Sequence, residues 1–181
     1  DWPAHGDQSN GEAANLAPFV DINNNQIYDP VNGDYPKING DQALYAIYND
    51  ARAENLASGG KKLGIEIHQM MYSYANNNNA LDTSFFVSYK IINRSQVDYH
   101  EVKTAIFTDF DIGNPYDDYF GCDTLRNTYF IYNKKDIDTT IMNDIGYGSS
   151  PPSAGLVFLN QNPSVIGYFN NIGSGSNPNT T

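Results

Sequence analysis

A period-two alternation of apolar and polar residues between positions 63 and 110 is the feature that most limits the fold of this chain. Successive side chains of a strand point to opposite faces, so this period indicates strands rather than helices. The clearest run covers residues 83–93, and a second run covers residues 99–110 after a short polar turn. Together they predict a hairpin, with residues 63–74 as a further strand beside it.

Shorter segments extend the same interpretation. Residues 41–49 are apolar and rich in tyrosine, which predicts a strand buried on both faces. Short strands are also predicted at residues 127–132, 155–160 and 164–169. The expected fold is an all-β, antiparallel, jelly-roll-like β-sandwich with the strands of residues 63–110 at its centre and long Asp/Asn-rich loops. We expect three parts: a loop region at residues 1–40 packed on the body, the sandwich body at 41–172, and a linker-like tail at 173–181.

Oxygen-bearing side chains recur at alternate positions just after residue 20. Calcium takes six to eight oxygen ligands, and an EF-hand-type loop supplies them from positions 1, 3, 5, 7 (a carbonyl), 9 and 12. Gln26 stands where the pattern has glycine, and Asn32 stands where it has a carboxylate. The alternative is a surface loop whose Asp and Asn side chains bond their own backbone. The predicted calcium ligands are Asp21, Asn23, Asn25, the carbonyl of Ile27, Asp29 and Asp34.

A second group of acidic residues follows the predicted hairpin, with Arg126 as the only nearby basic residue. Carboxylates this close repel one another unless a cation neutralises them. Three interpretations stay open: a second calcium site, a catalytic carboxylate set, or a solvated acidic loop. The second site would draw on Asp109, Asp111, Asp117, Asp118 and Asp123.

Three smaller patterns have both a chemical and a structural explanation. Glu66 and His68 share one face of a predicted strand, as a metal or acid–base pair or as an ordinary outward-facing pair. His5 could bind a metal with Asp7, but a loop histidine satisfied by local hydrogen bonds is favoured. Cys122 is the single cysteine and lies among acids, which favours a small buried residue over a nucleophile.

Charge and motif content exclude several classes of function. The net charge of −11 argues against nucleic acid as a partner and favours divalent cations. No apolar run approaches the length of a membrane-spanning helix. The chain has no nucleophile elbow, HExxH motif or P-loop, so we do not expect an enzyme. It lacks a signal peptide and begins at Asp1, so we expect a mature product or a piece of a longer protein.

Four segments resemble large secreted surface proteins of Bacteroidetes, the kind that carry a C-terminal sorting domain for type IX secretion. They are residues 1–7 (DWPAHGD), the loop at 21–36, residues 89–95 (YKIINRS) and residues 108–113 (TDFDIG). The resemblance covers residues 1–160 and implies export, an extracellular or cell-surface location and a longer parent chain. The N-glycosylation-type sequons at residues 93–95 and 179–181 fit a surface glycoprotein.

These observations lead to ranked hypotheses. The first is a non-catalytic module stabilised by one or two calcium ions, serving adhesion, surface assembly or display within a secreted protein. Its partners would be divalent cations and other subunits of a surface assembly. The second is calcium-dependent binding of surface glycans on a platform of Tyr116 and Tyr119, and the third is a glycan-active hydrolase.

Overall fold

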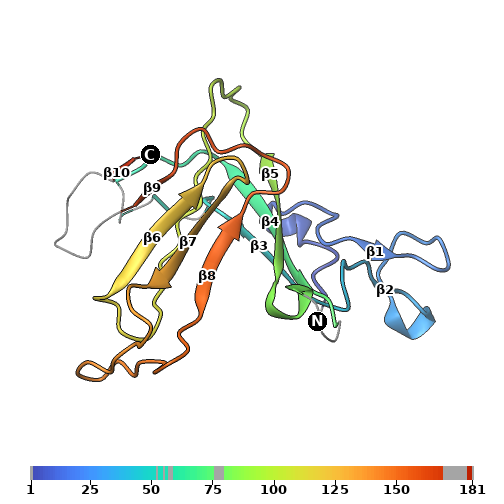
Figure 1. Ribbon diagram of the computed structural model, residues 1–181. Helices are drawn as coiled ribbons and strands as arrows, with labels where there is room; N and C mark the ends of the chain where they lie inside the picture. Colours follow the sequence, from blue (N-terminus) through green and yellow to red (C-terminus); the bar gives the residue numbers. More distant parts are fainter. Residues whose placement is uncertain are drawn as a thin grey trace. The chain divides into compact units, whose positions relative to one another are not determined.

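The computed structural model describes residues 2–51, 53–54, 56, 59–75, 80–168 and 179–180. Its regular structure is mostly strand, and every strand pair is antiparallel, so the predicted all-β class is confirmed (Figure 1). The chain divides into two compact units, Asp1–Val102 and Lys103–Thr181. The predicted boundaries at residues 40 and 172 stay predictions, and most of the predicted tail lies outside the described residues.

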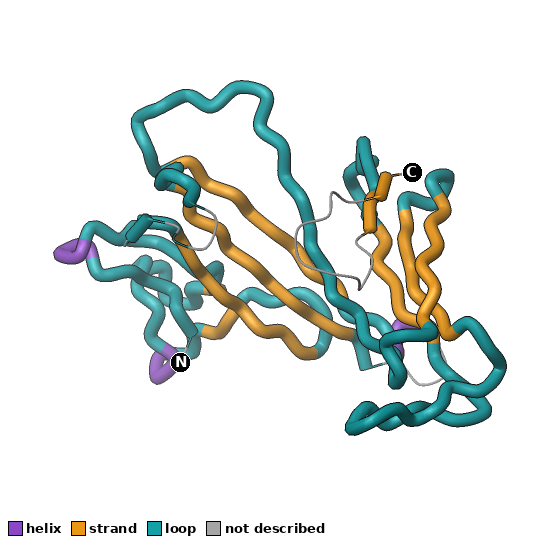
Figure 2. The backbone as a smooth tube through the Cα atoms, turned by 90° about the vertical axis from the view of Figure 1, so that its left-hand side faces the viewer, coloured by secondary structure: helices purple, strands orange, loops and turns teal. Residues whose placement is uncertain are grey.

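The first unit contains a three-stranded sheet of β3 (Gln42–Asn49), β4 (Ile65–Ser73) and β5 (Phe86–Asn93), with β4 in the centre (Figure 2). Its register places Tyr45 opposite Met70 and Ile67 opposite Ile91. The predicted strands at residues 41–49, 63–74 and 83–93 are therefore confirmed. A short 3-10 helix, η3 (Ala80–Thr83), precedes β5.

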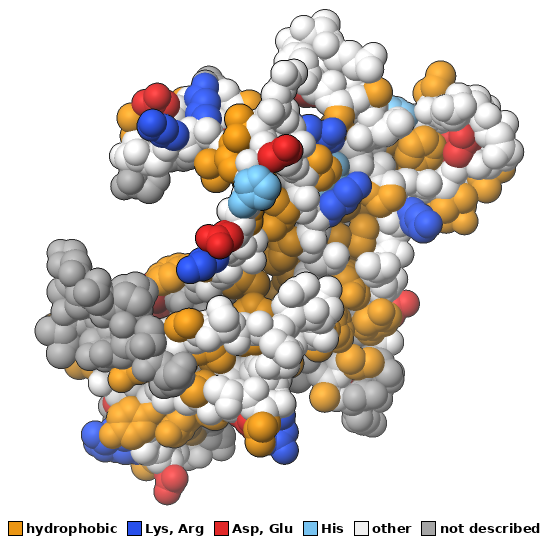
Figure 3. Space-filling model, turned by 90° about the horizontal axis from the view of Figure 1, so that it is seen from above, with side chains coloured by type: hydrophobic (Ala, Val, Ile, Leu, Met, Phe, Trp, Pro, Cys, Tyr) orange, Lys and Arg blue, Asp and Glu red, His pale blue; other side chains and the backbone are white. Residues whose placement is uncertain are grey.

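The two faces of this sheet differ in burial. On one face Glu66, His68 and Met70 of β4 are buried. Trp2 packs on Tyr45 there with ring centroids 5.2 Å apart, and its Nε1 donates to the carbonyl of Pro18 at 2.9 Å. On the other face apolar side chains such as Leu44 and Ile91 reach the surface. Hydrophobic side chains also reach the surface in the space-filling view of Figure 3. The prediction that residues 41–49 are buried on both faces is wrong, because Leu44 is 63% exposed.

The predicted hairpin of residues 83–93 and 99–110 is also wrong. Residues 99–110 contain no strand, and the described partner of β5 is β4. Side-chain bonds explain the departure: Asn93 accepts from the Ser95 amide at 2.9 Å, and its Nδ2 donates to the Val97 carbonyl at 2.8 Å. This local turn directs the chain away from the edge of β5 instead of back along it.

Near the N-terminus, β1 (Phe19–Val20) pairs with β2 (Tyr35–Pro36), and the loop at residues 21–34 connects them (Figure 1). A 3-10 helix, η2 (Pro30–Asn32), lies inside this loop, and another, η1 (Gln8–Asn10), precedes β1. The β1–β2 pair thus holds the two ends of the loop together.

The second unit contains a three-stranded sheet of β6 (Asp118–Asp123), β7 (Thr128–Asn133) and β8 (Ser153–Val157), with β7 in the centre. A separate pair joins β9 (Gly167–Tyr168) and β10 (Asn179–Thr180). Strands near residues 127–132, 155–160 and 164–169 were expected, whereas β6 replaces part of a predicted acidic loop. Half-buried Phe120 of β6 stacks on Tyr168 at 5.0 Å, and the buried apolar residues described in this unit are Ile112 and Ile166.

Candidate functional site

The buried side chain of Asp34 holds the loop at residues 21–34 together through hydrogen bonds to its backbone. This carboxylate is only 4% exposed. Its Oδ1 accepts from the Ile22 amide at 2.9 Å, and its Oδ2 accepts from the Asp29 amide at 3.0 Å. Asp34 therefore joins the start of the loop to its middle, in addition to any role as a predicted ligand.

The other predicted ligands face inward and bond the backbone of the same loop. Asp21 accepts from the amides of Asn25 at 3.2 Å and Gln26 at 2.7 Å. Asn23 Oδ1 accepts from the Asn25 amide at 3.1 Å, and Asn25 Oδ1 accepts from the Ile27 amide at 2.8 Å. Oxygens at loop positions 1, 3 and 5 are thus turned toward one backbone segment, as a calcium loop and an Asx-turn loop both require.

The backbone explains the departure at the glycine position. Gln26 has φ 65° and Asn24 has φ 58°, both in the left-handed region that glycine adopts most easily. Gln26 therefore takes the conformation that the sixth position of such a loop needs, although it has a side chain. The departure from the pattern is in residue type and not in backbone geometry.

Asp29, at the ninth position, accepts hydrogen bonds from three side-chain amides of the loop. Its Oδ2 accepts from Asn32 Nδ2 at 2.9 Å and from Asn25 Nδ2 at 3.0 Å, and Asn23 Nδ2 lies 3.4 Å from Oδ1. The hydrogen bond from Asn32, followed by those from the other amides, lowers the pKa of Asp29. The structure thus brings Asp21, Asn23, Asn25 and Asp29 into one hydrogen-bonded loop.

His5 supports this loop from the N-terminal segment. Its Nε2 accepts from the Tyr28 amide at 2.9 Å, so Nδ1 carries the hydrogen that is donated to the Ala14 carbonyl at 3.1 Å. The Asp7 carboxylate is instead bonded to Ser9 and Asn10. His5 is therefore a loop histidine satisfied by local hydrogen bonds, as the sequence favoured.

The second predicted site is only partly assembled. Asp117 and Asp118 stand together at the start of β6, while Asp123 ends that strand and pairs with Arg126. Asp109 and Asp111 are exposed, and Asp111 lies near enough for its charge to act on Asp118. The structure brings Asp111, Asp117 and Asp118 together and leaves Asp123 apart.

Two buried residues that the sequence analysis missed lie beside this pair. Asn133 of β7 is the register partner of Asp118 and is 8% exposed. Asp138 is buried, and it accepts from the Asn114 amide at 3.1 Å and the Tyr147 amide at 2.7 Å. Burial, followed by the charges of Asp117, Asp138 and Asp111, raises the pKa of Asp118. Asn133 belongs to no acidic run, so only the pairing of β6 with β7 could have pointed to it, whereas Asp138 lies outside the strands.

The two tyrosines of the predicted sugar platform lie just before and within β6. Tyr116 is 69% exposed. Tyr119 meets Tyr132 edge to face at 6.0 Å, and the Lys134 ammonium lies 5.2 Å from the centre of the Tyr119 ring. Carbohydrate binding at Tyr116 and Tyr119 therefore stays a prediction from sequence.

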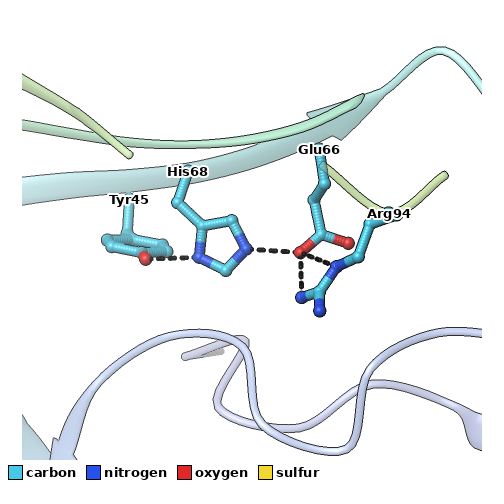
Figure 4. A network of polar contacts seen from close by, with 4 residues as sticks. All are labelled: Tyr45, Glu66, His68 and Arg94. Atoms are coloured by element: carbon cyan, nitrogen blue, oxygen red, sulfur yellow. Dashed lines mark hydrogen bonds and ion pairs between the residues drawn. The ribbon is translucent and has the colours of Figure 1, made fainter. Parts of the chain in front are cut away.

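A third polar group lies on the buried face of the first sheet (Figure 4). His68 Nε2 bonds Glu66 Oε1 at 2.7 Å, and His68 Nδ1 bonds the Tyr45 hydroxyl at 2.8 Å. Arg94 Nη2 donates to the same Glu66 oxygen at 2.6 Å. Glu66 and His68 are 7% and 3% exposed, so they form a pair that is buried and not outward-facing. Tyr45 and Arg94, which complete the network, were not identified from the sequence.

The electrostatics of this network favour a structural role. The Arg94 hydrogen bond, followed by that of His68, lowers the pKa of Glu66, which keeps its carboxylate charged. Burial and the Glu66 charge raise the pKa of Tyr45. Tyr45 therefore stays a phenol that donates to His68, which is the opposite of an activated nucleophile. The network links β3, β4 and the residue that follows β5.

In the described part of the chain, no group of three or more His, Cys, Asp or Glu side chains is arranged to hold a metal ion. None of the helices described there is long and apolar enough to cross a membrane. The chain matches no family model, no curated protein and no solved structure.

Proposed function

We propose that this chain is a non-catalytic, calcium-stabilised extracellular module of a larger secreted protein, serving adhesion, surface assembly or display. The observation that supports the proposal is the inward-turned oxygen set of residues 21–34. Asp21, Asn23, Asn25 and Asp29 stand at loop positions 1, 3, 5 and 9, on a loop whose ends are paired as β1 and β2.

A cation could replace the bonds that now join these side chains. Asn23 and Asn25 direct amide nitrogens at the Asp29 carboxylate at 3.0–3.5 Å. The oxygen and nitrogen of an amide have nearly the same shape, so a half-turn of each amide would place oxygens there instead. That turn would give up the bonds that the two amide oxygens accept from the Asn25 and Ile27 backbone, and binding of the cation would have to offset this loss. Calcium would then draw two carboxylates and two amide oxygens to one point, and the Ile27 carbonyl and water would complete the shell.

An extracellular location is consistent with calcium as the bound ion. Calcium outside cells is at millimolar concentration, and extracellular modules bind it with a Kd of about 10⁻⁴–10⁻³ M. Bound calcium would also offset part of the repulsion within a chain of net charge −11. We propose a jelly-roll-like sandwich as the finer architecture, because both three-stranded sheets are antiparallel and carry aromatic side chains.

Thermal unfolding with calcium and then with EGTA tests this function. If calcium is present at 10–100 times its Kd, it should stabilise the folded chain by about 1.5–3 kcal/mol, because it binds the folded loop and not the unfolded chain. Tm should then fall by several degrees when EGTA removes the ion. Differential scanning calorimetry on the full chain measures this shift.

Two matched variants locate the effect. Asp29→Asn removes a ligand charge from the loop and should reduce the calcium-dependent rise in Tm. Asp98→Asn removes one exposed charge from the same unit and should leave that rise unchanged. A chain that melts at one temperature in calcium and in EGTA would exclude a structural role for this ion.

A further inference from the structure

Three buried oxygen atoms at the start of β6 have no hydrogen-bond partner among the described residues: Oδ1 of Asp117, Oδ1 of Asp118 and Oδ1 of Asn133. Buried side-chain oxygens nearly always have a partner, and leaving one without costs about 1–3 kcal/mol or more when it carries charge. Three such atoms in one small region therefore need a common explanation.

The sheet brings these atoms to one place. Asp118 and Asn133 are register partners on β6 and β7, so their side chains leave the same face of the sheet. Asp117 directly precedes the strand, and its carboxylate lies near enough for its charge to act on Asp118. The three oxygens thus come from the paired ends of two strands and are not scattered along a loop.

The remaining bonds leave these oxygens, and not other atoms, without partners. Asn133 Nδ2 donates to the Lys135 carbonyl at 2.7 Å, which fixes the amide and leaves Oδ1 as its free atom. Asp118 Oδ2 accepts from the Ile112 amide at 3.1 Å, which leaves Oδ1. Asn133 is more than nine-tenths buried, so bulk water does not satisfy its oxygen.

The missing partner must be positively charged or a strong donor. The set consists of acceptors only, two of them on carboxylates, and the nearby Asp111 and Asp138 add negative charge. Lys134 is next in sequence to Asn133, but its ammonium lies over the Tyr119 ring. Arg126 is paired with Asp123 at the other end of β6. No basic side chain in the described part of the chain, Lys135 included, is hydrogen-bonded to the three oxygens.

We infer that Asp117, Asp118 and Asn133 hold a hard divalent cation at the paired ends of β6 and β7. Two carboxylate oxygens and one amide oxygen suit a cation that prefers oxygen ligands, and water would fill the rest of its shell. This set differs from the one expected from sequence, because it contains Asn133 and lacks Asp109 and Asp123. The inference does not depend on the proposed function, because the loop at residues 21–34 belongs to the other unit.

Calcium titration by isothermal calorimetry tests the inference on the full chain, with calcium chloride as the probe. Asp118→Asn keeps the shape of the side chain and removes one ligand charge. It should weaken one calcium-binding event at least about tenfold, and Asp29→Asn should leave that event intact. Asp144→Asn removes an exposed charge from the same unit and serves as the matched control.

Thermal stability in EGTA gives a second test, because without a cation Asp118→Asn should stabilise the chain although it weakens calcium binding. Without a cation, Asp118→Asn removes a buried charge that faces other carboxylates, so its Tm should rise above that of the wild type. In saturating calcium this advantage should shrink or reverse. A variant that is more stable in EGTA and yet keeps its full calcium binding would overturn the inference. If calcium titration shows no binding event that depends on Asp29, the loop site is overturned and this one still stands.

Discussion

Replacing Glu66 by alanine is expected to lower the free energy of unfolding of the first unit by about 3 kcal/mol. The substitution removes the acceptor of both His68 Nε2 and Arg94 Nη2, and His68 is too buried to find water instead. Glu54→Ala, at an exposed position of the same unit, should change stability by less than about 0.5 kcal/mol. Urea unfolding followed by far-ultraviolet circular dichroism measures both variants.

The stabilising contribution of the Glu66 carboxylate should also depend on pH. The pKa of Glu66 is lowered below its ordinary value of 4.5, chiefly by Arg94. Its contribution is therefore fully present above that value and is lost as the pH falls through the lower folded value. The stability difference between wild type and Glu66→Gln should shrink when unfolding is repeated from neutral pH down to about pH 3. A difference that stays constant over this range would mean that the Arg94 pairing contributes nothing.

Gly40→Ala should lower the free energy of unfolding at least as much, by about 3–4 kcal/mol. Gly40 has φ 68°, and a Cβ atom there would lie 2.3 Å from the carbonyl oxygen of Ser73. That carbonyl accepts the Asp41 amide at 2.9 Å, so it cannot withdraw without loosening the start of β3. Equilibrium unfolding in urea measures the loss.

Gly11→Ala distinguishes the cost of the steric clash at Gly40 from the cost of a left-handed backbone conformation. Gly11 has φ 79°, also in the left-handed region, but a Cβ atom there would meet nothing within 4 Å. Gly11→Ala should therefore lower the free energy of unfolding by only about 1 kcal/mol, the cost of placing alanine in the left-handed region. Equal losses in the two variants would show that the Ser73 contact is harmless.

The sequence was a good guide to single strands and a poor guide to their partners. Alternation located β4 and β5, because side-chain direction in a strand follows directly from residue order, and an apolar, tyrosine-rich run located β3. It also suggested a strand at residues 99–110, where the periodicity exists but no pairing occurs. A strand needs a neighbour for its backbone bonds, and after the turn made by Asn93 this segment makes no described ladder with β5.

The candidate sites follow the same rule. The 21–34 loop could be predicted residue by residue, because one short segment supplies every side chain in it. The second site could not, because Asn133 reaches Asp118 only through the pairing of β6 with β7. Asp123 was included because it is close in sequence, yet a strand of six residues spans about 20 Å. Proximity along a strand is therefore not proximity in space.

The packing of Trp2 against Tyr45 gives the chain a built-in optical reporter. Trp2 is the only tryptophan in the sequence, and it belongs to the first unit. Its indole fluorescence should shift to longer wavelength when the N-terminal segment leaves the sheet, while opening of the second unit should leave the emission colour unchanged. A spectrometer could therefore follow the two halves of this chain separately without any attached label.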